Sequence, residues 1–298
     1  MNDTSVVKQT RQLLRNYGIQ PKKRLGQNFL TDDRVLERIV QAAEIDQNVG
    51  VIEIGPGLGA LTEKLAQEAR QVLAIELDNR LIPILEERFD DDPHVTIIQG
   101  DALKIDFHQL INQMKEVREV NVVANLPYYI TSPILIHLLQ NRFPFRRLVV
   151  MVQKEVANRL VALPGTKEYG SLSVFAQYFA LVRQVFTVPR HVFIPQPNVD
   201  SSVVRFDLLA SPAVNVINEP FFFQLVRASF AKRRKTLVNA LYAVYSSILS
   251  KAEIKRLLQA AQIDPQRRGE TCSLNEFARM TAIFLKSYPQ LGDYSLEV

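Results

Sequence analysis

The sequence predicts an α/β fold in which an open, mostly parallel, Rossmann-like sheet is followed by a smaller all-α domain. Three observations carry this prediction. Short apolar runs alternate with segments of helical periodicity from about residue 32 to residue 153. One apolar run, 49–54, leads into closely spaced glycines, which is typical of a strand entering a nucleotide-binding turn. From about residue 211 the pattern becomes wholly helical.

The alternation can be followed element by element. The expected helices are 32–43, 60–68, 80–89, 132–141 and 154–163, and the expected strands are 51–54, 72–75, 96–98, 120–124 and 147–153. A patch at 170–188 follows, and 191–206 reads as an extended, proline-rich loop and strand that closes the sheet. Ser211 and Pro212 mark a boundary. We therefore expect a basic arm at 1–30, a ligand-binding domain at 31–210 and a helical domain at 211–298.

The first turn carries Gly55, Gly57 and Gly59 between the strand and the following helix. Glycines let the backbone turn sharply and let a ligand approach without meeting a Cβ atom. Glu76 ends the next apolar run, where an acidic side chain can accept hydrogen bonds from a ribose diol. The pattern therefore predicts a ligand that contains a ribose.

The glycine spacing also satisfies a loose dinucleotide fingerprint, because Ala60 is permitted at its last position. Two details favour another ligand. Pro56 stiffens the turn, and Glu53 places a carboxylate where a pyrophosphate would be repelled. A ligand with a cationic or amine-bearing end, such as S-adenosylmethionine, suits this carboxylate better. A dinucleotide and a purely structural glycine turn remain alternatives.

A second strand-to-turn segment ends in Asn125, Leu126, Pro127 and Tyr128. An amino group on an aromatic ring is a poor nucleophile, because its lone pair is delocalised, and it needs acceptors for its two hydrogens. The Asn125 side-chain oxygen and the Leu126 carbonyl can supply them. Pro127 fixes the local φ, and Tyr128 offers a face for a flipped-out adenine. Taken alone, an ordinary strand-end turn with core tyrosines explains these residues equally well.

A third strand, 96–98, leads to Gly100 and Asp101. At the carboxyl end of a strand beside the glycine turn, Asp101 can accept a hydrogen bond from the amino group of a bound adenine. The alternative role is a helix or turn cap, which Asp often fills.

Charge is concentrated at both ends of the chain. Residues 1–30 carry a net charge of +5, residues 31–210 carry −5 and residues 211–298 carry +5. We expect basic clusters flanking an acidic middle to contact the phosphates of a nucleic acid, although a solvated helix face is the usual fate of a charge run. The later cluster falls in an expected helix at 220–245. The candidate phosphate-binding residues are Lys22, Lys23, Arg24, Arg227, Lys232, Arg233, Arg234 and Lys235.

Composition excludes several other classes. The single Cys272 rules out an internal disulfide, and with four scattered histidines it leaves no recognisable zinc spacing, so we expect no metal site. No stretch approaches the roughly 18 continuous apolar residues of a membrane span, and the polar start lacks a signal-peptide core. We expect a cytoplasmic protein without a membrane partner.

Five motifs together resemble the ribosomal RNA adenine dimethyltransferases, and within that family the bacterial small-subunit type. The resemblance extends from about residue 22 to residue 280. The motifs are Leu-Gly-Gln-Asn-Phe-Leu at 25–30, Glu-Ile-Gly-Pro-Gly-Leu-Gly at 53–59, Gly-Asp at 100–101, Asn-Leu-Pro-Tyr at 125–128 and Phe-Ile-Pro-Gln-Pro-Asn-Val-Asp-Ser-Ser-Val-Val at 193–204.

The resemblance implies a class I S-adenosylmethionine-dependent methyltransferase sheet and a role for each matching residue. It implies that Asn28 and Leu30 contact the methionine part of the donor and that Gly55 cradles it. Glu76 would bind the ribose, Asp101 the adenine, and Asn125 the junction of donor and target base. Tyr128 and Phe193 would sandwich the target adenine.

The implied reaction is dimethylation of two adjacent adenosines near the 3′ end of 16S rRNA in the small ribosomal subunit, with S-adenosyl-L-methionine as methyl donor. No obligate protein partner is evident, and we expect a monomer. Two rivals stay open: a large-subunit rRNA methyltransferase of the antibiotic-resistance type, and a ribosome-assembly or RNA-binding factor that retains the methyltransferase fold.

Overall fold

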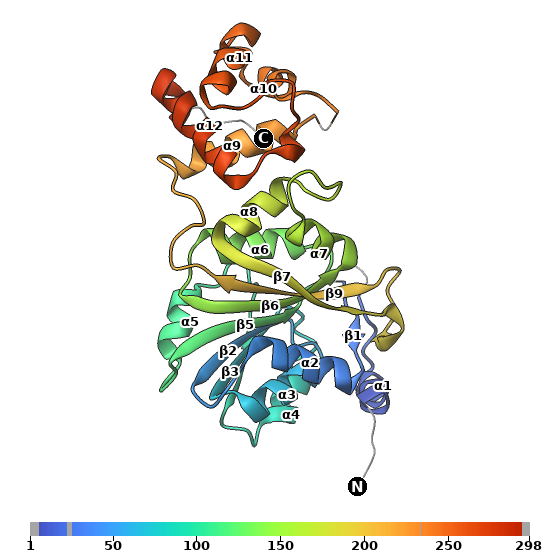
Figure 1. Cartoon of the computed structure of the whole chain (residues 1–298). Helices are drawn as coiled ribbons and strands as arrows, with labels where there is room; N and C mark the ends of the chain where they lie inside the picture. The colour runs from blue at the N-terminus through green and yellow to red at the C-terminus, as the bar shows by residue number, and fades with distance from the viewer. Residues whose placement is uncertain (1–5, 23–25, 233, 294–298) are drawn as a thin grey trace. The chain divides into compact units, whose positions relative to one another are not determined.

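The computed structural model describes residues 6–22, 26–232 and 234–293, and its contacts divide the chain into two compact units (Figure 1). The sheet unit comprises Met1–Ala157 and Leu181–Leu208, and the helical unit comprises Asn158–Ala180 and Leu209–Val298. Residues 158–180 therefore pack with the helical unit, whereas the sequence placed them with the sheet. The reason is aromatic packing, described below.

The sheet unit is built on a seven-stranded sheet with the order β4-β3-β2-β5-β6-β9-β7. Strands β2 to β6 pair in parallel, and β9 pairs antiparallel with β6. Because β2 lies between β3 and β5, the strand order reverses beside it, and this reversal opens a crevice at the carboxyl ends of the strands. The strands are β1 (Phe29–Leu30), β2 (Val49–Ile54), β3 (Gln71–Glu76), β4 (Val95–Gln99), β5 (Glu119–Asn125), β6 (Phe145–Gln153), β7 (Ala180–Val188), β8 (Phe193–Ile194) and β9 (Ser201–Leu208).

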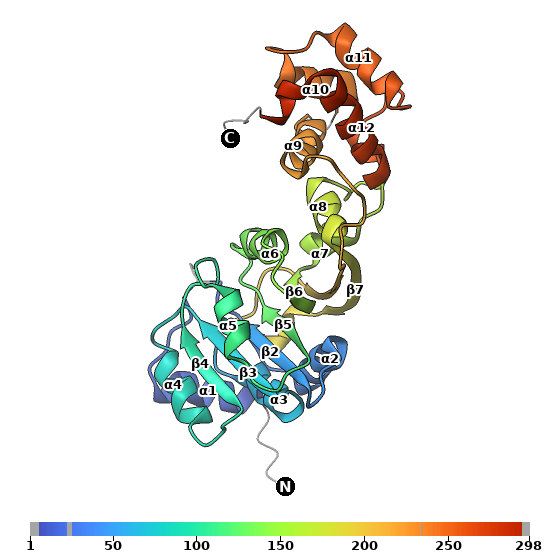
Figure 2. The same ribbon diagram turned by 90° about the vertical axis from the view of Figure 1, so that its left-hand side faces the viewer.

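Helices cover both faces of this sheet. Figures 1 and 2 show α2, α3 and α4 on one face and α5 and α6 on the other. The central strand β2 is buried along its whole length, as expected for a parallel strand covered on both sides. The helices up to the sheet's sixth strand are α1 (Val6–Asn16), α2 (Asp33–Ala43), α3 (Ala60–Glu68), α4 (Ile82–Phe89), α5 (Phe107–Gln113) and α6 (Thr131–Gln140).

The helical unit has its own aromatic core. Phe175 and Tyr178 of α8 pack against Phe223 and Phe222 of α9, with ring centroids 5.2 Å apart in each pair. These contacts hold α8 to the helical unit. After α7 (Lys154–Val161), the helices are α8 (Ser171–Phe179), α9 (Glu219–Phe230), α10 (Leu237–Tyr245), α11 (Lys251–Ala260) and α12 (Leu274–Ser287), with short 3₁₀ turns η2 (Arg190–Val192), η3 (Gly269–Thr271) and η4 (Pro289–Gly292).

The expected continuous helix at 220–245 is wrong. Helix α9 ends at Phe230 and α10 begins at Leu237, with a turn between them that is closed by a hydrogen bond from Lys235 N to Lys232 O of 2.9 Å. Both helices bury apolar faces in the same core, and consecutive cations disfavour a helix through repulsion. The seven-residue spacing of Phe230 and Leu237 keeps the helical period across the turn, so periodicity alone did not reveal the break.

Helices α1 and α5 lie where no helix was expected. Helix α1 occupies part of the basic arm, and Leu13 and Leu14 pack against a small cluster that includes Leu81 and Ile84 beside α4. Helix α5 is short, and its N-cap is Asp106, whose carboxylate accepts hydrogen bonds from the backbone N–H groups of His108 and Gln109. The first helix therefore belongs to the sheet unit rather than to a free arm.

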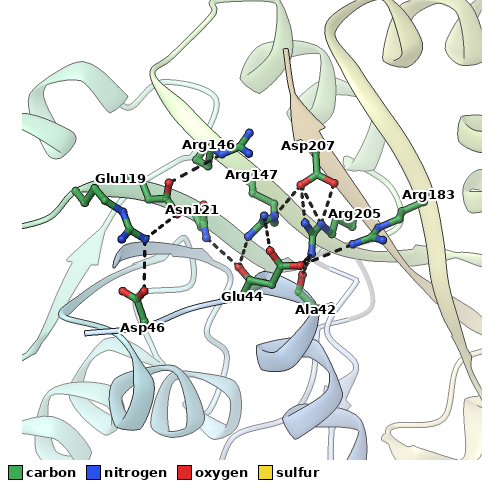
Figure 3. A network of polar contacts seen from close by, with 12 residues as sticks. Ala42, Glu44, Asp46, Glu119, Asn121, Arg146, Arg147, Arg183, Arg205 and Asp207 are labelled. Atoms are coloured by element: carbon green, nitrogen blue, oxygen red, sulfur yellow. Dashed lines mark hydrogen bonds and ion pairs between the residues drawn. The ribbon is translucent and has the colours of Figure 1, made fainter. Parts of the chain in front are cut away.

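An ion network holds the carboxyl end of α2 against strands β6 and β9 (Figure 3). The Nη1 atoms of Arg147 and Arg205 donate to the carbonyls of Ala43 and Ala42, at 2.8 and 3.1 Å. Both arginines are buried, and both also pair with Asp207 at 2.8 Å. The network matters for the site because α2 carries Leu36, which lines the pocket described next.

Candidate active site

A pocket lies at the carboxyl ends of the central strands, beside the reversal in strand order. Segments far apart in the sequence meet there: the N-terminal segment before β1, the turn after β2, the end of β3, the turn after β4 and the turn after β5. Nine of the predicted catalytic and donor-binding residues line it. They are Asn28, Leu30, Gly55, Glu76, Asp101, Asn125, Leu126, Pro127 and Tyr128.

The glycine turn after β2 forms the floor of the pocket. Gly55 donates its N–H to the carbonyl of Ile75 at 2.9 Å, which ties the turn to β3. Gly57 has a φ of +62°, and a Cβ atom there would lie 3.1 Å from the ring of Phe29. Glycine is therefore required both for the backbone conformation and for the approach of the N-terminal segment.

Glu76 ends β3 with a buried carboxylate held by two backbone groups. Its Oε2 accepts from Gly57 N at 3.1 Å, and its Oε1 accepts from Asp78 N at 2.8 Å. Burial raises the pKa of Glu76 above its usual value, and these backbone hydrogen bonds oppose the rise. Each carboxylate oxygen has a second lone pair, so the group can also accept hydrogen bonds from a diol.

Glu53 is a second buried carboxyl group beside the pocket, with 1% of its surface exposed. Its Oε2 atom makes no hydrogen bond within the described part of the chain. Burial raises the pKa of Glu53 to about 8, and the negative charge of Glu76 adds to the rise. The sequence interpretation placed a carboxylate here, but in the absence of a cation this group is mostly protonated at pH 7.

Asp101 lines the pocket and also caps its own turn. Its Oδ1 accepts from Leu103 N at 3.0 Å, and its carbonyl accepts from Lys104 N at 2.8 Å. The capping role and the ligand-facing role, which the sequence left as alternatives, are thus compatible in one residue. The cap fixes the carboxylate in place for a partner in the pocket.

The turn after β5 is anchored on both sides. Leu126 N donates to Met151 O of β6 at 3.1 Å, and Pro127 O accepts from Ile130 N at 3.1 Å. Asn125 Nδ2 donates to Asn28 O at 3.2 Å. Because the amide nitrogen is used by the N-terminal segment, the Oδ1 atom is the end of Asn125 that can accept a hydrogen bond from a substrate.

The N-terminal segment packs closely on this turn. Gly26 has a φ of +60°, and a Cβ atom there would lie 3.2 Å from Pro127 Cβ and 3.3 Å from the ring of Tyr129. Asn28 Nδ2 donates to Gly26 O at 3.0 Å, which keeps the segment curved around the pocket. The pocket wall therefore includes a chain segment about 100 residues away in sequence from the turn it covers.

Phe193 is not brought to the pocket. It lies in β8, where it pairs with Leu30 of β1, and its side chain is 3% exposed within the apolar core of the sheet unit. The ring is absent from the pocket lining and makes no ring contact with Tyr128 in the described part of the chain. The stacking role that the resemblance implies for Phe193 therefore stays a prediction, without support from the pocket lining.

The geometry agrees with what comparison with known proteins shows. A family model described as ribosomal RNA adenine dimethylase matches residues 18–280. The chain belongs to this family. It is 53% identical over 283 residues to the ribosomal RNA small subunit methyltransferase A of Bacillus cereus, covering 94% of this chain and 97% of that protein. The corresponding protein of Bacillus mycoides is 52% identical over 283 residues.

Solved structures of family members and relatives have the same fold. A dimethyladenosine transferase from Plasmodium falciparum superposes with a TM-score of 0.71 at 28% identity, covering 87% of this chain and 98% of that one. The 23S rRNA methyltransferase ErmE superposes with a TM-score of 0.64 at 25% identity, covering 86% and 99%. The expected class I methyltransferase fold, a Rossmann-like sheet followed by a helical part, is confirmed.

The methyl donor of this dimethylase is S-adenosyl-L-methionine, and the pocket suits it. The floor of the pocket has positive-φ glycines that leave room for a ligand, and a buried carboxylate stands at the end of β3. The unpartnered buried oxygen of Glu53 is a further acceptor beside the pocket. These features fit a ligand with a ribose diol and a cationic end better than one with a pyrophosphate.

The candidate phosphate-binding cations differ in whether they are paired within the protein or exposed to solvent. Lys22 is used inside the sheet unit, where its Nζ lies 3.4 Å from the buried carboxylate of Asp78. Arg227 on α9 is exposed, and so are Lys232, Arg234 and Lys235 in the turn after it. Lys23, Arg24 and Arg233 lie outside the described residues.

Sequence reasoning missed several residues of the pocket. Leu77 directly follows Glu76 and is 47% exposed, which offers an apolar surface beside the buried carboxylate of Glu76. Tyr129 is 53% exposed at the same pocket. Gln27 donates to Asp78 Oδ2 at 2.8 Å and so ties the N-terminal segment to the loop after β3. The position of Leu77 immediately after the acidic strand end could have indicated the first of these.

The described residues contain neither a candidate metal site nor a membrane-spanning helix. In ranges 6–22, 26–232 and 234–293, no three His, Cys, Asp or Glu residues are placed to hold a metal ion. Within the same ranges, no helix has the length and apolar character needed to span a bilayer.

Proposed function

We propose that this protein methylates the 6-amino groups of two adjacent adenosines near the 3′ end of 16S rRNA, dimethylating each with S-adenosyl-L-methionine as donor. One observation carries the proposal: a single pocket joins the glycine turn, Glu76 and Asp101 to the Asn125–Asn28 contact of 3.2 Å. The proposed donor residues and the proposed reacting turn are therefore adjacent. The substrate follows from relatives named as small subunit methyltransferases at 53% identity.

In this proposal the residues of the chain act mainly by positioning. The donor, when bound, supplies an electrophilic methyl group on a sulfonium. Asn125 Oδ1 and the Leu126 carbonyl accept the two hydrogens of the target amine, so that its lone pair becomes available. Tyr128 supplies the stacking face for the flipped adenine. No strong base is needed before attack, because the nitrogen becomes acidic only once it carries the new bond.

The donor residues take the roles that the family motifs imply. Glu76 accepts hydrogen bonds from the ribose hydroxyls, and Asp101 accepts one from the adenine amino group. Gly55 cradles the methionine part of the donor. Asn28 and Leu30 line the methionine end. Phe193 would join the stack only if the short β1–β8 ladder shifted, because its ring is enclosed in the core.

We further propose that the exposed cations of the helical unit bind rRNA phosphates: Arg227, Lys232, Arg234 and Lys235, together with Arg233, Lys23 and Arg24 from the sequence clusters. Lys22 contributes less in this proposal, because it already pairs with Asp78. Acting on the small subunit, the protein would be cytoplasmic and would need no obligate protein partner, as a monomer.

The test is to incubate the protein with labelled methyl donor and either unmethylated small subunits or large subunits, and then to map the modified base. We expect label on two neighbouring adenosines of 16S rRNA, as N6-dimethyladenosine. Label confined to 23S rRNA would support the large-subunit alternative. The 23S rRNA methyltransferase ErmE is 25% identical to this chain. Tight binding to small subunits with no transfer would support a binding factor instead.

A further inference from the structure

Residues 198–204 form the later part of the motif at 193–204, and none of them has a role in the proposed reaction described so far. The motif leads into β9, whose first two residues, Ser201 and Ser202, are both fully buried. The Ser201 hydroxyl lies 2.7 Å from the phenol oxygen of Tyr128. Tyr128 lines the pocket, so this hydrogen bond joins the start of β9 to the residue that offers the stacking face.

Ser201 is held as a fixed anchor. It pairs with Gln153 of β6 in the seven-stranded sheet. The residue before it, Asp200, is held on two sides: its carbonyl accepts from Lys154 N at 3.0 Å, and its Oδ1 accepts from Arg190 N at 3.0 Å. A hydroxyl at this point therefore moves little relative to β5 and β6.

Tyr128 needs such an anchor because its backbone contacts do not determine the orientation of its ring. The turn holds the backbone at Leu126 and Pro127, but the ring can still rotate about its two side-chain torsions. A hydrogen bond at the far end of the phenol removes that freedom. Burial raises the pKa of the Tyr128 phenol, so the phenol keeps its proton at the pH of an ordinary assay.

We propose that Ser201 is a positioning residue for methyl transfer, whose hydroxyl holds the phenol of Tyr128 and so fixes the plane on which the target adenine stacks. This inference rests on the proposed function, in which Tyr128 contacts the base. The stacked adenine carries the reacting nitrogen. A tilt of the Tyr128 ring would therefore tilt the adenine and displace its nitrogen from the line of attack. Displacements of about 1 Å can cost on the order of 100-fold in rate.

The neighbouring serine provides a matched control. Ser202 is equally buried and lies on the same strand, but its hydroxyl accepts from Gln184 Nε2 at 3.1 Å and has no link to Tyr128. A purely structural role of buried hydroxyls predicts similar effects of Ser201→Ala and Ser202→Ala. A positioning role predicts an effect of Ser201→Ala alone.

The experiment compares the full-length wild type with Ser201→Ala, Tyr128→Phe, their double variant and Ser202→Ala. Measurements are kcat and KM with unmethylated small subunits and labelled donor, donor Kd by calorimetry, and the thermal midpoint. We expect Ser201→Ala and Tyr128→Phe each to lower kcat about tenfold, with donor Kd within twofold of wild type. The double variant should lose no more than either single variant, since both remove one contact. Ser202→Ala should keep kcat within twofold.

Three results would each overturn the inference. They are a wild-type kcat in Ser201→Ala, an equal loss of kcat in Ser202→Ala, and losses that multiply in the double variant. If Ser201→Ala does not fold, Tyr128→Phe decides alone, because it keeps the ring and leaves β9 unchanged; wild-type kcat in that variant overturns the inference. These results leave the proposed function standing when the wild type methylates 16S adenosines. Absence of transfer by the wild type to any rRNA adenosine overturns both.

Discussion

At the scale of single residues, the pocket contains two buried glutamates that differ in their partners. Glu76 is held by two backbone N–H groups, whereas Glu53 Oε2 has no hydrogen-bond partner in the described part of the chain. Burial raises the pKa of both. Glu76 is thus prepared as an acceptor in the free protein, while Glu53 is ionised only when a positive charge approaches it or the pH is high.

Asn125→Ala should lower methyl transfer about 100-fold or more while donor affinity stays within a few-fold. The reason is that a preorganised acceptor at the reacting atom contributes about 3–4 kcal/mol in the transition state. Single-turnover transfer to small subunits and donor binding by calorimetry measure the two quantities separately. A variant with normal turnover would remove Asn125 from the chemistry.

Glu53→Gln should change the pH dependence of stability. The pKa of Glu53 is about 8 in the folded protein and its ordinary value is 4.5, so between these values the folded state holds a proton that the unfolded state lacks. Stability of the wild type should therefore fall as pH rises across this window, by about 1.4 kcal/mol per unit relative to the Gln variant, and should level off above the folded pKa.

Urea unfolding of both proteins, without donor, at several values between about pH 5 and pH 9 measures this difference. A stability difference that stays constant across the window would show that Glu53 is ionised in the folded protein. The sulfonium donor should weaken the effect in the wild type, because a nearby positive charge stabilises the carboxylate.

At the scale of elements, the carboxyl end of α2 shows how the sheet holds a helix. The carbonyls at this end carry a partial negative charge, and Arg147 and Arg205 donate to two of them from β6 and β9 (Figure 3). Burial would raise the pKa of Asp207, but the two arginines lower it below its ordinary value. Arg147 and Arg205 thus pair both with the carbonyls at the end of α2 and with the carboxylates of Glu44 and Asp207.

Arg147→Ala should destabilise the sheet unit by about 3 kcal/mol, near the lower limit for breaking a buried pair, because Glu44 remains half exposed to water. Arg146→Ala is the matched control: Arg146 is the neighbour on β6, is exposed, and lies 3.9 Å from Glu119. The control should lose no more than about 0.5 kcal/mol. Chemical unfolding monitored by circular dichroism compares them, and equal losses would contradict a special role for the buried arginine.

The sequence predicted the parallel strands and their helices well, because these elements have strong periodicity and because glycine, acidic or amide residues stand at the ends of the strands. It did not predict the break after Phe230, since the helical period continues across the turn and only the packing of α9 against α10 requires the chain to reverse. Helix α1 was hidden for the opposite reason: its charges resemble those of an arm, and its apolar side is recognised only by packing beside α4.

The site shows the same division between local and distant contacts. Local motifs placed Glu76, Asp101 and Asn125 at one pocket, because the ends of parallel strands meet at one edge of a sheet. The enclosed position of Phe193 depends on its pairing with Leu30, which lies more than 160 residues away in the chain, and no local pattern reports such a pairing.

At the scale of the whole molecule, charge is distributed unevenly along the chain. The acidic middle of the chain holds the donor pocket, and the basic residues of 211–298 lie in the helical unit. Lys22 pairs within the sheet unit with Asp78, at 3.4 Å. Hydrogen bonds from Arg80 and Gln27 hold the pKa of Asp78 well below its ordinary value. The turn between α9 and α10 is therefore the described region where exposed cations are most concentrated along the chain.

Replacing Lys232, Arg234 and Lys235 with Glu should weaken binding to small subunits strongly, while the fold and donor binding survive. Each lost phosphate contact releases one fewer counterion, so the slope of log affinity against log salt should become shallower by about 0.7–0.9 per contact. The charge-matched control replaces Lys251, Lys255 and Arg256 of α11, which are equally exposed in the same unit.

Binding to unmethylated small subunits at several salt concentrations, with a thermal melt of each variant, distinguishes a specific contact from general electrostatic attraction. A specific contact predicts that the turn variant loses both affinity and salt slope, whereas the α11 variant changes little. Equal losses in both variants would mean that only the overall charge matters, because long-range attraction does not depend on which exposed cation is reversed. An unchanged slope in a folded turn variant would shift rRNA docking to the basic N-terminal cluster, where reversal of Lys23 and Arg24 would then have to reproduce the loss.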